Sequence, residues 1–378
     1  MDLEQSAINP PTPGSVKRYL TLDTLRGVAA LMVVMFHSGQ RIGVWTPRFG
    51  YLAVDMFFLL SGFVLACAYD DRLQRGMATT EFMIARVVRL YPLYVIGLLL
   101  GACLAPLNLS LTNWTLQNAG FSFSLHLFGL PSPPLMQVEG QDAIFALNPP
   151  FWSLFFEFWV ANAAFALFHA RLRGKALLCL ILVFACALIV CEKQFYGLIG
   201  GWTWSSIVVG FARVGFSFFC GVAIARYIRG IPKPRAPAWA LALALPLLLS
   251  IPLDGRIAHL YELFCVLVAF PALICLGSTA IERKPSLGTA LGEASYAIYA
   301  IHYPLLVVAS WIALKLALQP SLQLQLAFAV ALIAPGWALN RADALVRNSI
   351  LNATRPNILS AAAAADGPHA TAQASNRC

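Results

Sequence analysis

The chain has 378 residues, of which 59% are hydrophobic and only 11% are charged. Soluble domains carry about 25% charged residues because their surfaces face water. The composition therefore excludes soluble enzymes, disordered proteins and secreted disulfide scaffolds, and predicts a protein whose solvent is largely lipid. The net charge of +9 comes from short basic clusters between apolar runs, which indicate orientation in a membrane rather than binding to nucleic acid.

Apolar runs of membrane-spanning length recur along the whole chain. A helix requires about 20 apolar residues to cross a bilayer core of about 30 Å. By this criterion the sequence predicts an all-α, polytopic membrane helix bundle of about ten transmembrane helices, the seventh being short and containing Pro246. In chain order the predicted spans are Leu20–Gln40, Tyr51–Ala68, Met83–Ala105, Phe151–Phe168, Ala176–Cys191, Ser205–Tyr227, Ala238–Pro252, His259–Ser278, Thr289–Leu314 and Leu322–Leu339.

The basic residues are divided unequally between the two sides of this bundle. If the N-terminus is cytoplasmic, 19 of the 26 Lys and Arg residues face inward, 5 face outward, and Arg26 and Arg213 lie within spans. The positive-inside rule then predicts that both termini are cytoplasmic. We accordingly expect a cytoplasmic segment at 1–19, a membrane domain at 20–347 and a disordered, Ala/Ser-rich cytoplasmic tail at 348–378.

The first span contains two ionisable residues, Arg26 and His37. They are eleven residues apart, which at about 100° per residue places them on one helical face, with a rise of about 16 Å between them. Singly, Arg26 would be a snorkelling arginine and His37 a histidine packed against a carbonyl. Ionisable residues inside a span are functional candidates, and the alignment of the pair favours a functional interpretation.

Two carboxylates are predicted to enter the membrane from the outer side. Asp55 lies about one turn inside the second span, where the helix dipole alone would favour a carboxylate. Glu157 lies about 9 Å inside the fourth span, at a depth similar to that of His37. Because nothing nearby in sequence can neutralise Glu157, we expect its partner on another helix, and His37 is the best-placed candidate.

Two arginines, Arg86 and Arg89, share a helical face at the inner end of the third span. They satisfy the positive-inside rule, and they would equally suit phosphates, which arginine binds through two parallel hydrogen bonds. With Arg26 they are expected to form a cationic mouth on the cytoplasmic side. The long outward connection at 106–150 contains no Lys or Arg, and it is interpreted either as a functional loop or as a plug folded over the bundle.

The ninth span places Tyr296, Tyr299 and His302 on one face. An interfacial aromatic belt is the simpler interpretation, but their position past the middle of the span argues mildly against it. The nine cysteines form no CxxC pair, so neither a metal site nor a disulfide framework is predicted.

Together these segments resemble the acyltransferase-3 family of integral-membrane O-acyltransferases. The match rests on LDTLRG with His37 eleven positions after its arginine, VDMFFLLSGF around Asp55, RVVRLYP from Arg86, WSLFFE ending at Glu157, and SYAIYAIH ending at His302. Phe158 stands where many members carry a second acidic residue, so a role for that acid is not expected. We also expect no extracellular hydrolase-like domain after the last span.

The resemblance implies an enzyme of a bacterial inner membrane that passes an acyl group, often acetyl, from cytoplasmic acyl-CoA to a hydroxyl of a cell-surface glycan or similar acceptor. It implies that His37 is the catalytic histidine, that Arg26 is its partner in the motif, and that Arg86, Arg89 and Glu157 match family positions. No metal and no permanently bound cofactor are expected, because acyl-CoA is a substrate. The acceptor stays open among surface polysaccharides, peptidoglycan, a lipid-linked sugar and a small antibiotic.

We predict that His37 acts as a general base and that Glu157, or else Asp55, holds its imidazole. The CoA phosphates are predicted to meet Arg26, Arg86 and Arg89. The residues predicted to line the acceptor side are Tyr299, His302 and Trp152. A covalent acyl-His37 intermediate is left open. The alternative function is a transporter or flippase for a glycan or anionic metabolite, although the sequence lacks an inverted repeat.

Overall fold

The computed structural model describes residues 19–228, 231, 236–279, 287–347 and 349. Within these ranges the chain is almost entirely helical, with one two-stranded sheet. Nine helices of the described ranges are long and apolar enough to cross a membrane, which confirms the all-α polytopic bundle. The predicted N-terminal segment, apart from Tyr19, and the predicted C-terminal tail, apart from Ser349, lie outside the described residues.

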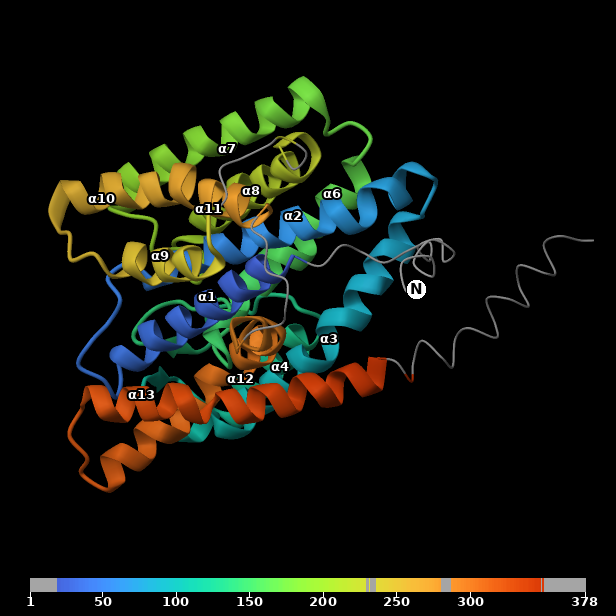
Figure 1. Cartoon of the computed structure of the whole chain (residues 1–378). Helices are drawn as coiled ribbons and strands as arrows, with labels where there is room; N and C mark the ends of the chain where they lie inside the picture. Colours follow the sequence, from blue (N-terminus) through green and yellow to red (C-terminus); the bar gives the residue numbers. More distant parts are fainter. Residues whose placement is uncertain (1–18, 229–230, 232–235, 280–286, 348, 350–378) are drawn as a thin grey trace, which may run out of the picture.

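The nine spanning segments follow the predicted order (Figure 1). Several of them combine α-helix with short 3₁₀ or π-helical turns, which are labelled η. They are α1 (Leu20–Gly39); η1 (Gly50–Leu52) with α2 (Ala53–Gln74); α3 (Thr79–Leu104) with η2 (Ala105–Leu107); η3 (Pro149–Phe151) with α5 (Trp152–Phe155), η4 (Phe156–Asn162) and α6 (Ala163–Phe168); α7 (Gly174–Phe195); α8 (Ile207–Ala223) with η5 (Ile224–Ile228); α10 (Gly255–Phe264) with η6 (Cys265–Ala269) and α11 (Phe270–Gly277); α12 (Leu287–Lys315); and the helix Leu322–Arg347, which begins as α13 (Leu322–Ala331).

The predicted seventh span is the exception. It forms α9 (Ala238–Ser250), a helix of 13 residues. At 1.5 Å per residue this helix is about 20 Å long, shorter than a hydrocarbon core of about 30 Å. Its buried residues Leu241, Leu245 and Leu249 lie four apart on one face, and the helix packs beside α1 (Figure 1). The segment is therefore a short apolar helix of the bundle rather than a full-length span.

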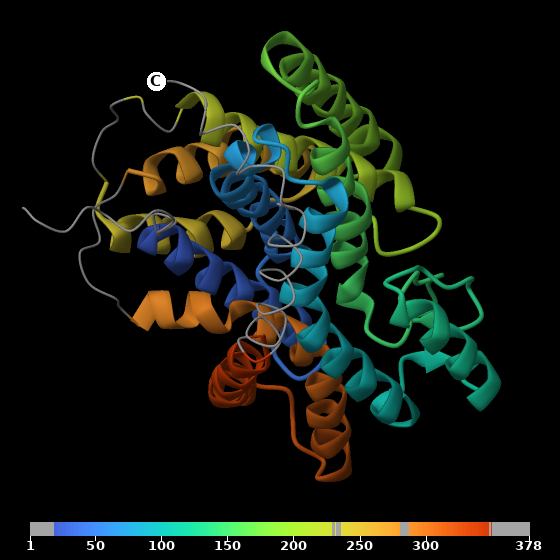
Figure 2. The same cartoon turned by 90° about the vertical axis from the view of Figure 1, so that its right-hand side faces the viewer.

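The helices differ in how much of their surface is covered by the rest of the protein. The apolar windows of α1, α2, α8 and α12 are 61 to 72% buried, whereas that of α7 is 17% buried. Figures 1 and 2 show α7 and the helix that begins with α13 at opposite edges of the bundle. The well-buried helices are therefore the ones that can hold polar residues away from lipid.

The contact between α1 and α12 is unusually close because glycines lie on both helices. A Cβ atom on Gly292 would stand 2.0 Å from the carbonyl oxygen of Asp23, and one on Gly27 would stand 2.7 Å from the backbone nitrogen of Gly292. Small residues of this kind let membrane helices approach backbone to backbone. This contact fixes the register between α1 and α12 along much of their length.

Replacing Gly292 with alanine should therefore destabilise the protein. The added methyl group forces α1 and α12 apart, and overpacking of this kind costs about 1–3 kcal/mol. We expect a lower midpoint of thermal unfolding for the detergent-solubilised variant. Gly120→Ala is the matched control, because a Cβ atom there meets nothing within 4 Å. Equal midpoints for the two variants would contradict the close packing.

The 106–150 connection folds into a cap against the bundle. It contains α4 (Leu116–Leu127) and the antiparallel strands β1 (Leu111–Thr112) and β2 (Gln137–Val138). Residues 143–147 are at most 4% exposed. In Figure 2 the teal segment with α4 lies at the edge of the bundle beside α3.

Aromatic side chains donate hydrogen bonds to the carbonyl groups at and just after the C-terminal end of α4. The Tyr91 hydroxyl donates to the Leu127 carbonyl at 2.9 Å, and the Trp159 indole donates to the Phe128 carbonyl at 3.2 Å. The Tyr94 hydroxyl donates to the carbonyl of His126. Carbonyl groups at a helix end lack intrahelical partners, so these three bonds anchor the cap to α3 and η4.

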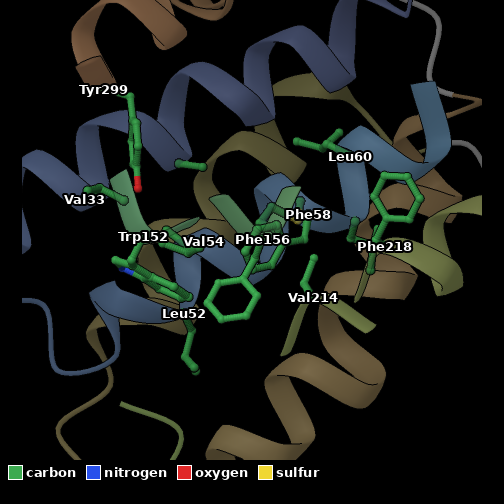
Figure 3. Close-up of a cluster of buried hydrophobic side chains, with 14 of the residues drawn as sticks. Val33, Leu52, Val54, Phe58, Leu60, Trp152, Phe156, Val214, Phe218 and Tyr299 are labelled. Atoms are coloured by element: carbon green, nitrogen blue, oxygen red, sulfur yellow. The ribbon is translucent and has the colours of Figure 1, made fainter. Parts of the chain in front are cut away.

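A cluster of buried aromatic side chains packs α5 and η4 against α2 and α8 (Figure 3). The ring of Phe58 meets Trp152 edge-on at 6.2 Å between centroids, and Trp152 meets Phe156 at 5.8 Å. Such edge-to-face pairs stabilise a fixed ring geometry. The cluster therefore holds the start of α5 in place, and with it the wall of the cavities described below.

Candidate active site

Two histidines from distant parts of the chain meet at one end of the bundle. His37 lies in the last turn of α1, and His302 lies on α12. The His302 Nε2 atom is 3.1 Å from the Nδ1 atom of His37, and the ring centroids are 5.2 Å apart. His302 is fully buried, while His37 is partly exposed to a cavity. The close packing of α1 on α12 brings the pair together.

The hydrogen bonds of His302 fix the tautomer of His37 when both rings are neutral. The Nδ1 atom of His302 lies 2.7 Å from the Tyr299 carbonyl oxygen, which can only accept, so this nitrogen carries the proton. The Nε2 atom of His302 is then an acceptor, and the Nδ1 atom of His37 must donate to it. The remaining nitrogen of His37, Nε2, therefore keeps its lone pair and is the basic atom of the pair.

His37 lines a cavity of about 220 Å³, which we call the His37 chamber. Two predicted acceptor-side residues, Trp152 and Tyr299, also line it, whereas the third, His302, lies behind His37. The lining residues are Val33, Phe36, His37, Gln40, Tyr51, Val54, Val138, Glu139, Pro149, Pro150, Trp152, Ile199, Gly200, Trp202, Arg213, Tyr299 and Tyr303.

The predicted pairing of Glu157 with His37 is wrong. The Glu157 carboxylate accepts a hydrogen bond of 2.6 Å from Ser61 and lies 3.4 Å from the Arg86 guanidinium. Glu157 was expected at the depth of His37, but its side chain turns into a different cavity, on the other side of Val54 and Tyr299. The Glu157 carboxylate therefore forms an ion pair with Arg86 and does not contact the His37 imidazole.

Asp55 does not hold the imidazole either. Its carboxylate accepts from the Arg213 guanidinium of α8 at 2.7 to 3.2 Å, and both side chains are at most 2% exposed. Arg213 also donates to the carbonyl oxygens of Gly200 and Tyr51, and it stacks over the Trp152 ring at 5.1 Å. The sequence offered a signal for this pair, because each residue is an ionisable group inside a span.

The three arginines predicted as phosphate ligands line one cavity of about 160 Å³. We call it the arginine chamber and define it by Arg26, Arg86, Arg89, Glu157, Tyr296 and Arg347, the last of which was not predicted. Arg26 is anchored to Ser295 and to the Gly292 carbonyl of α12, both at 3.2 Å. The chamber therefore lies toward the N-terminal end of α1, opposite His37.

Arg89 differs from its neighbours in the arginine chamber. Arg26 pairs with Asp23, Arg86 with Glu157, and Arg347 with Asp343 at 2.9 Å. No described residue forms an ion pair with Arg89, whose side chain is exposed to the chamber. An exposed guanidinium in a cavity is suited to bind an anionic ligand.

The two chambers meet at a thin wall formed by Val54 and Tyr299, which line both. The Tyr299 hydroxyl lies 2.7 Å from the Pro150 carbonyl oxygen and 2.7 Å from the Ser153 hydroxyl. Figure 3 shows the phenol pointing toward Val54 and Trp152. Neighbouring residues of α5 thus face different chambers, since Trp152 lines the His37 chamber and Ser153 lines the arginine chamber.

A polar network closes the His37 chamber on its other side. Arg41 donates to the Tyr303 hydroxyl at 2.6 Å, to Glu139 at 3.2 Å and to Asn108 at 3.3 Å. Glu139 and Asn108 belong to the 106–150 cap, which therefore both covers the bundle and contributes lining residues to the chamber. Glu139 adopts a φ of +56° and Gly140 a φ of +73°, because they are the central residues of a tight turn closed by the two backbone hydrogen bonds between Val138 and Gln141.

Side chains that could bind a metal ion are a further feature of interest at such a site. In the part of the chain that the structure describes, no group of three or more His, Cys, Asp or Glu side chains is arranged to hold a metal ion. The site chemistry that the described side chains offer is that of an imidazole base and a set of guanidinium groups.

Comparison with known proteins finds a family model that covers most of the chain and relatives that match smaller or larger parts of it. A family model described as "Acyltransferase domain" matches residues 19–341. The chain is 40% identical over 190 residues to "Protein 2 in picA locus" of Rhizobium radiobacter, covering 47% of this chain and 97% of that protein. It is 31% identical over 160 residues to Acyltransferase MdmB of Streptomyces mycarofaciens, covering 39% of this chain and 38% of that one.

A third relative matches over a longer stretch. BcsY of Komagataeibacter xylinus, named as a proposed membrane-bound transacylase, is 22% identical over 334 residues, which is 80% of each chain. No solved structure shows a significant match to this chain.

Proposed function

This chain belongs to the acyltransferase family whose domain model spans residues 19–341, and we propose that it transfers an acyl group from acyl-CoA to a hydroxyl of a cell-surface glycan or similar acceptor. Because the chain belongs to an enzyme family, we favour acyl transfer over the alternative function of a transporter or flippase. The relatives named as an acyltransferase and a transacylase agree with this reaction class. Acetyl is the proposed acyl group, and the bacterial inner membrane is the proposed location.

The single observation that carries the proposal is the pair of chambers that share a wall. The arginine chamber offers cations for a phosphorylated donor, and the His37 chamber offers a base for a hydroxyl acceptor. Arg26 and His37 are separated by a rise of about 16 Å along α1, a distance that the extended arm of an acyl-CoA spans. We propose that the arm passes between Val54 and Tyr299 from the cytoplasmic side.

In the proposed reaction the basic Nε2 atom of His37 takes the proton of the acceptor hydroxyl. The acceptor oxygen attacks the thioester carbonyl and forms a tetrahedral intermediate, from which the carbon–sulfur bond breaks. The imidazolium then returns its proton to the CoA thiolate, so the products are an ester and free CoA. His302 holds the productive tautomer of His37, which is the role that an orienting carboxylate has in other histidine-based acyl transfer.

Substitution of Arg89 tests the donor site. We expect Arg89→Ala to raise the KM for acetyl-CoA by about tenfold to a hundredfold, because a hydrogen bond to a charged group contributes about 1.5–3 kcal/mol. Acyl transfer by the purified protein in lipid nanodiscs is followed through the release of free CoA thiol.

Arg75→Ala is the matched control for this experiment. It removes the same charge from the exposed turn between α2 and α3, outside the arginine chamber. If the two variants change the KM for acetyl-CoA equally, the arginine chamber is not the donor site.

A further inference from the structure

A third cavity, of about 390 Å³, adjoins the His37 chamber. The two cavities share four lining residues, Phe36, Gln40, Tyr51 and Ile199. The rim of the third cavity is open to the surroundings, since Tyr196 is 83% exposed and Ile199 is 52% exposed. The shared residues place this cavity directly beside the His37 chamber, between that chamber and the exposed rim.

The lining of this cavity combines aromatic rings with hydrogen-bonding groups. Phe36, Phe49 and Tyr51 form apolar walls. Thr46 and Gln40 bring neutral polar groups from the segment that follows α1. A ligand that presents apolar CH faces and a rim of hydroxyl groups complements such a lining, because rings pack on the faces while polar side chains bond the rim.

The charges of the lining are already compensated within the protein. Among the described lining residues Arg48 is the only Lys or Arg, and its guanidinium is held by Asp254 at 2.8 Å. Glu262 is 5% exposed, and its carboxylate accepts a hydrogen bond from the backbone N–H of Leu198. His259 lies 3.6 Å from Glu192 and 4.0 Å from Glu262. A neutral ligand therefore fits this cavity better than an anion, in contrast to the arginine chamber.

From these observations we propose that this cavity is the vestibule through which a neutral, saccharide-like hydroxyl acceptor reaches His37. The proposal rests on the proposed function, and it names the acceptor class and its path. Donor and acceptor then approach the reacting atoms from opposite ends of α1, which allows both to be bound at once. Ile199 and Gln40 line both cavities and form the neck of the path.

Filling the neck tests the vestibule. In lipid nanodiscs, the variant Ile199→Trp is assayed with acetyl-CoA as donor and, as acceptor, the saccharide fraction from the envelope of a strain that lacks this chain. We expect the KM for the saccharide fraction to rise at least tenfold. The KM for acetyl-CoA should stay within twofold of wild type, because the donor is bound in the arginine chamber and Ile199 does not line that chamber.

Ile257→Trp is the matched control, since Ile257 is an exposed isoleucine of α10 that lines neither cavity. Gln40→Ala is a second variant that adds no bulk, and its exposed side chain makes misfolding no concern. Gln40→Ala should raise the KM for the saccharide fraction, because it removes the side chain that is proposed to form a hydrogen bond with the saccharide.

Three outcomes separate the two proposals. If Ile199→Trp and Gln40→Ala keep the wild-type KM for saccharide while transfer continues, the vestibule is refuted and the proposed function stands. If the wild type hydrolyses acetyl-CoA but acylates only non-saccharide alcohols, the acceptor class is refuted. If the wild type consumes no acyl-CoA, the proposed function fails and the vestibule fails with it.

Discussion

Replacing His37 with alanine is expected to reduce acyl transfer by about 10²–10⁴-fold, the range that a general base contributes. The loss should appear in kcat, because the His37 Nε2 atom accepts the hydroxyl proton in the reacting complex and does not hold the donor. The KM for acetyl-CoA should remain near that of the wild type, since the arginine chamber lies on the other side of Val54 and Tyr299. Initial rates in nanodiscs measure both constants.

His169→Ala is the control for this experiment, because His169 lines none of the cavities described above. The companion variant His302→Ala should lower kcat less than His37→Ala, since it removes only the group that orients the imidazole. Full activity of the His37 variant would remove the base from the mechanism. An equal loss in a His37→Ala/His302→Ala double variant and in His37→Ala is also expected, because the two residues act as a unit.

The features within single helices could be predicted from the sequence. The alignment of Arg26 with His37 follows from the regular geometry of α1, and the shared face of Arg86 and Arg89 follows from that of α3. Both required only residue spacing and helical periodicity. All three arginines indeed line one chamber, although their contact with a donor remains a prediction.

The contacts between helices were harder to predict. His37 and His302 are separated by 265 positions, and their contact depends on backbone packing of α1 against α12 at Gly27 and Gly292. Periodicity gives the face of a helix but not the helix that it meets. The depth of Glu157 was estimated for a regular helix, whereas η4 is a π-helical segment that begins one residue earlier, and such segments shift the direction of side chains.

The partner of Asp55, in contrast, was within reach of sequence reasoning. Asp55 and Arg213 are ionisable residues inside predicted spans, and the cost of burying either alone makes a pair the expected solution. The prediction that Asp55 could take the place of Glu157 beside His37 is wrong because Arg213 is the partner of the Asp55 carboxylate. In the structure the pair joins α2 to α8 and supports the Trp152 wall of the His37 chamber.

Breaking this pair should therefore have a large effect on stability. Asp55→Ala leaves the Arg213 guanidinium buried without its counter-charge, and the loss of one partner of a buried pair costs about 3–5 kcal/mol. We expect a marked fall in the thermal unfolding midpoint in detergent and a lower yield of folded protein. Asp23→Ala is the matched control, because its partner Arg26 is 26% exposed and better hydrated once the carboxylate is removed.

A double variant separates the structural role of Asp55 from the catalytic role first predicted for it. In Asp55→Leu/Arg213→Met both charges are absent, and replacing a buried ion pair by apolar side chains is often neutral or stabilising. The unfolding midpoint should then recover most of what Asp55→Ala loses. If Asp55 instead oriented the imidazole, the additional removal of Arg213 would not restore the group that accepts the proton from His37 or the tautomer that this group fixes. In that case Asp55→Asn would lower kcat while the unfolding midpoint stayed unchanged. Recovery of the midpoint in the double variant, together with a near-normal kcat in Asp55→Asn, would assign the orienting role to His302 and the joining of α2 and α8 to Asp55.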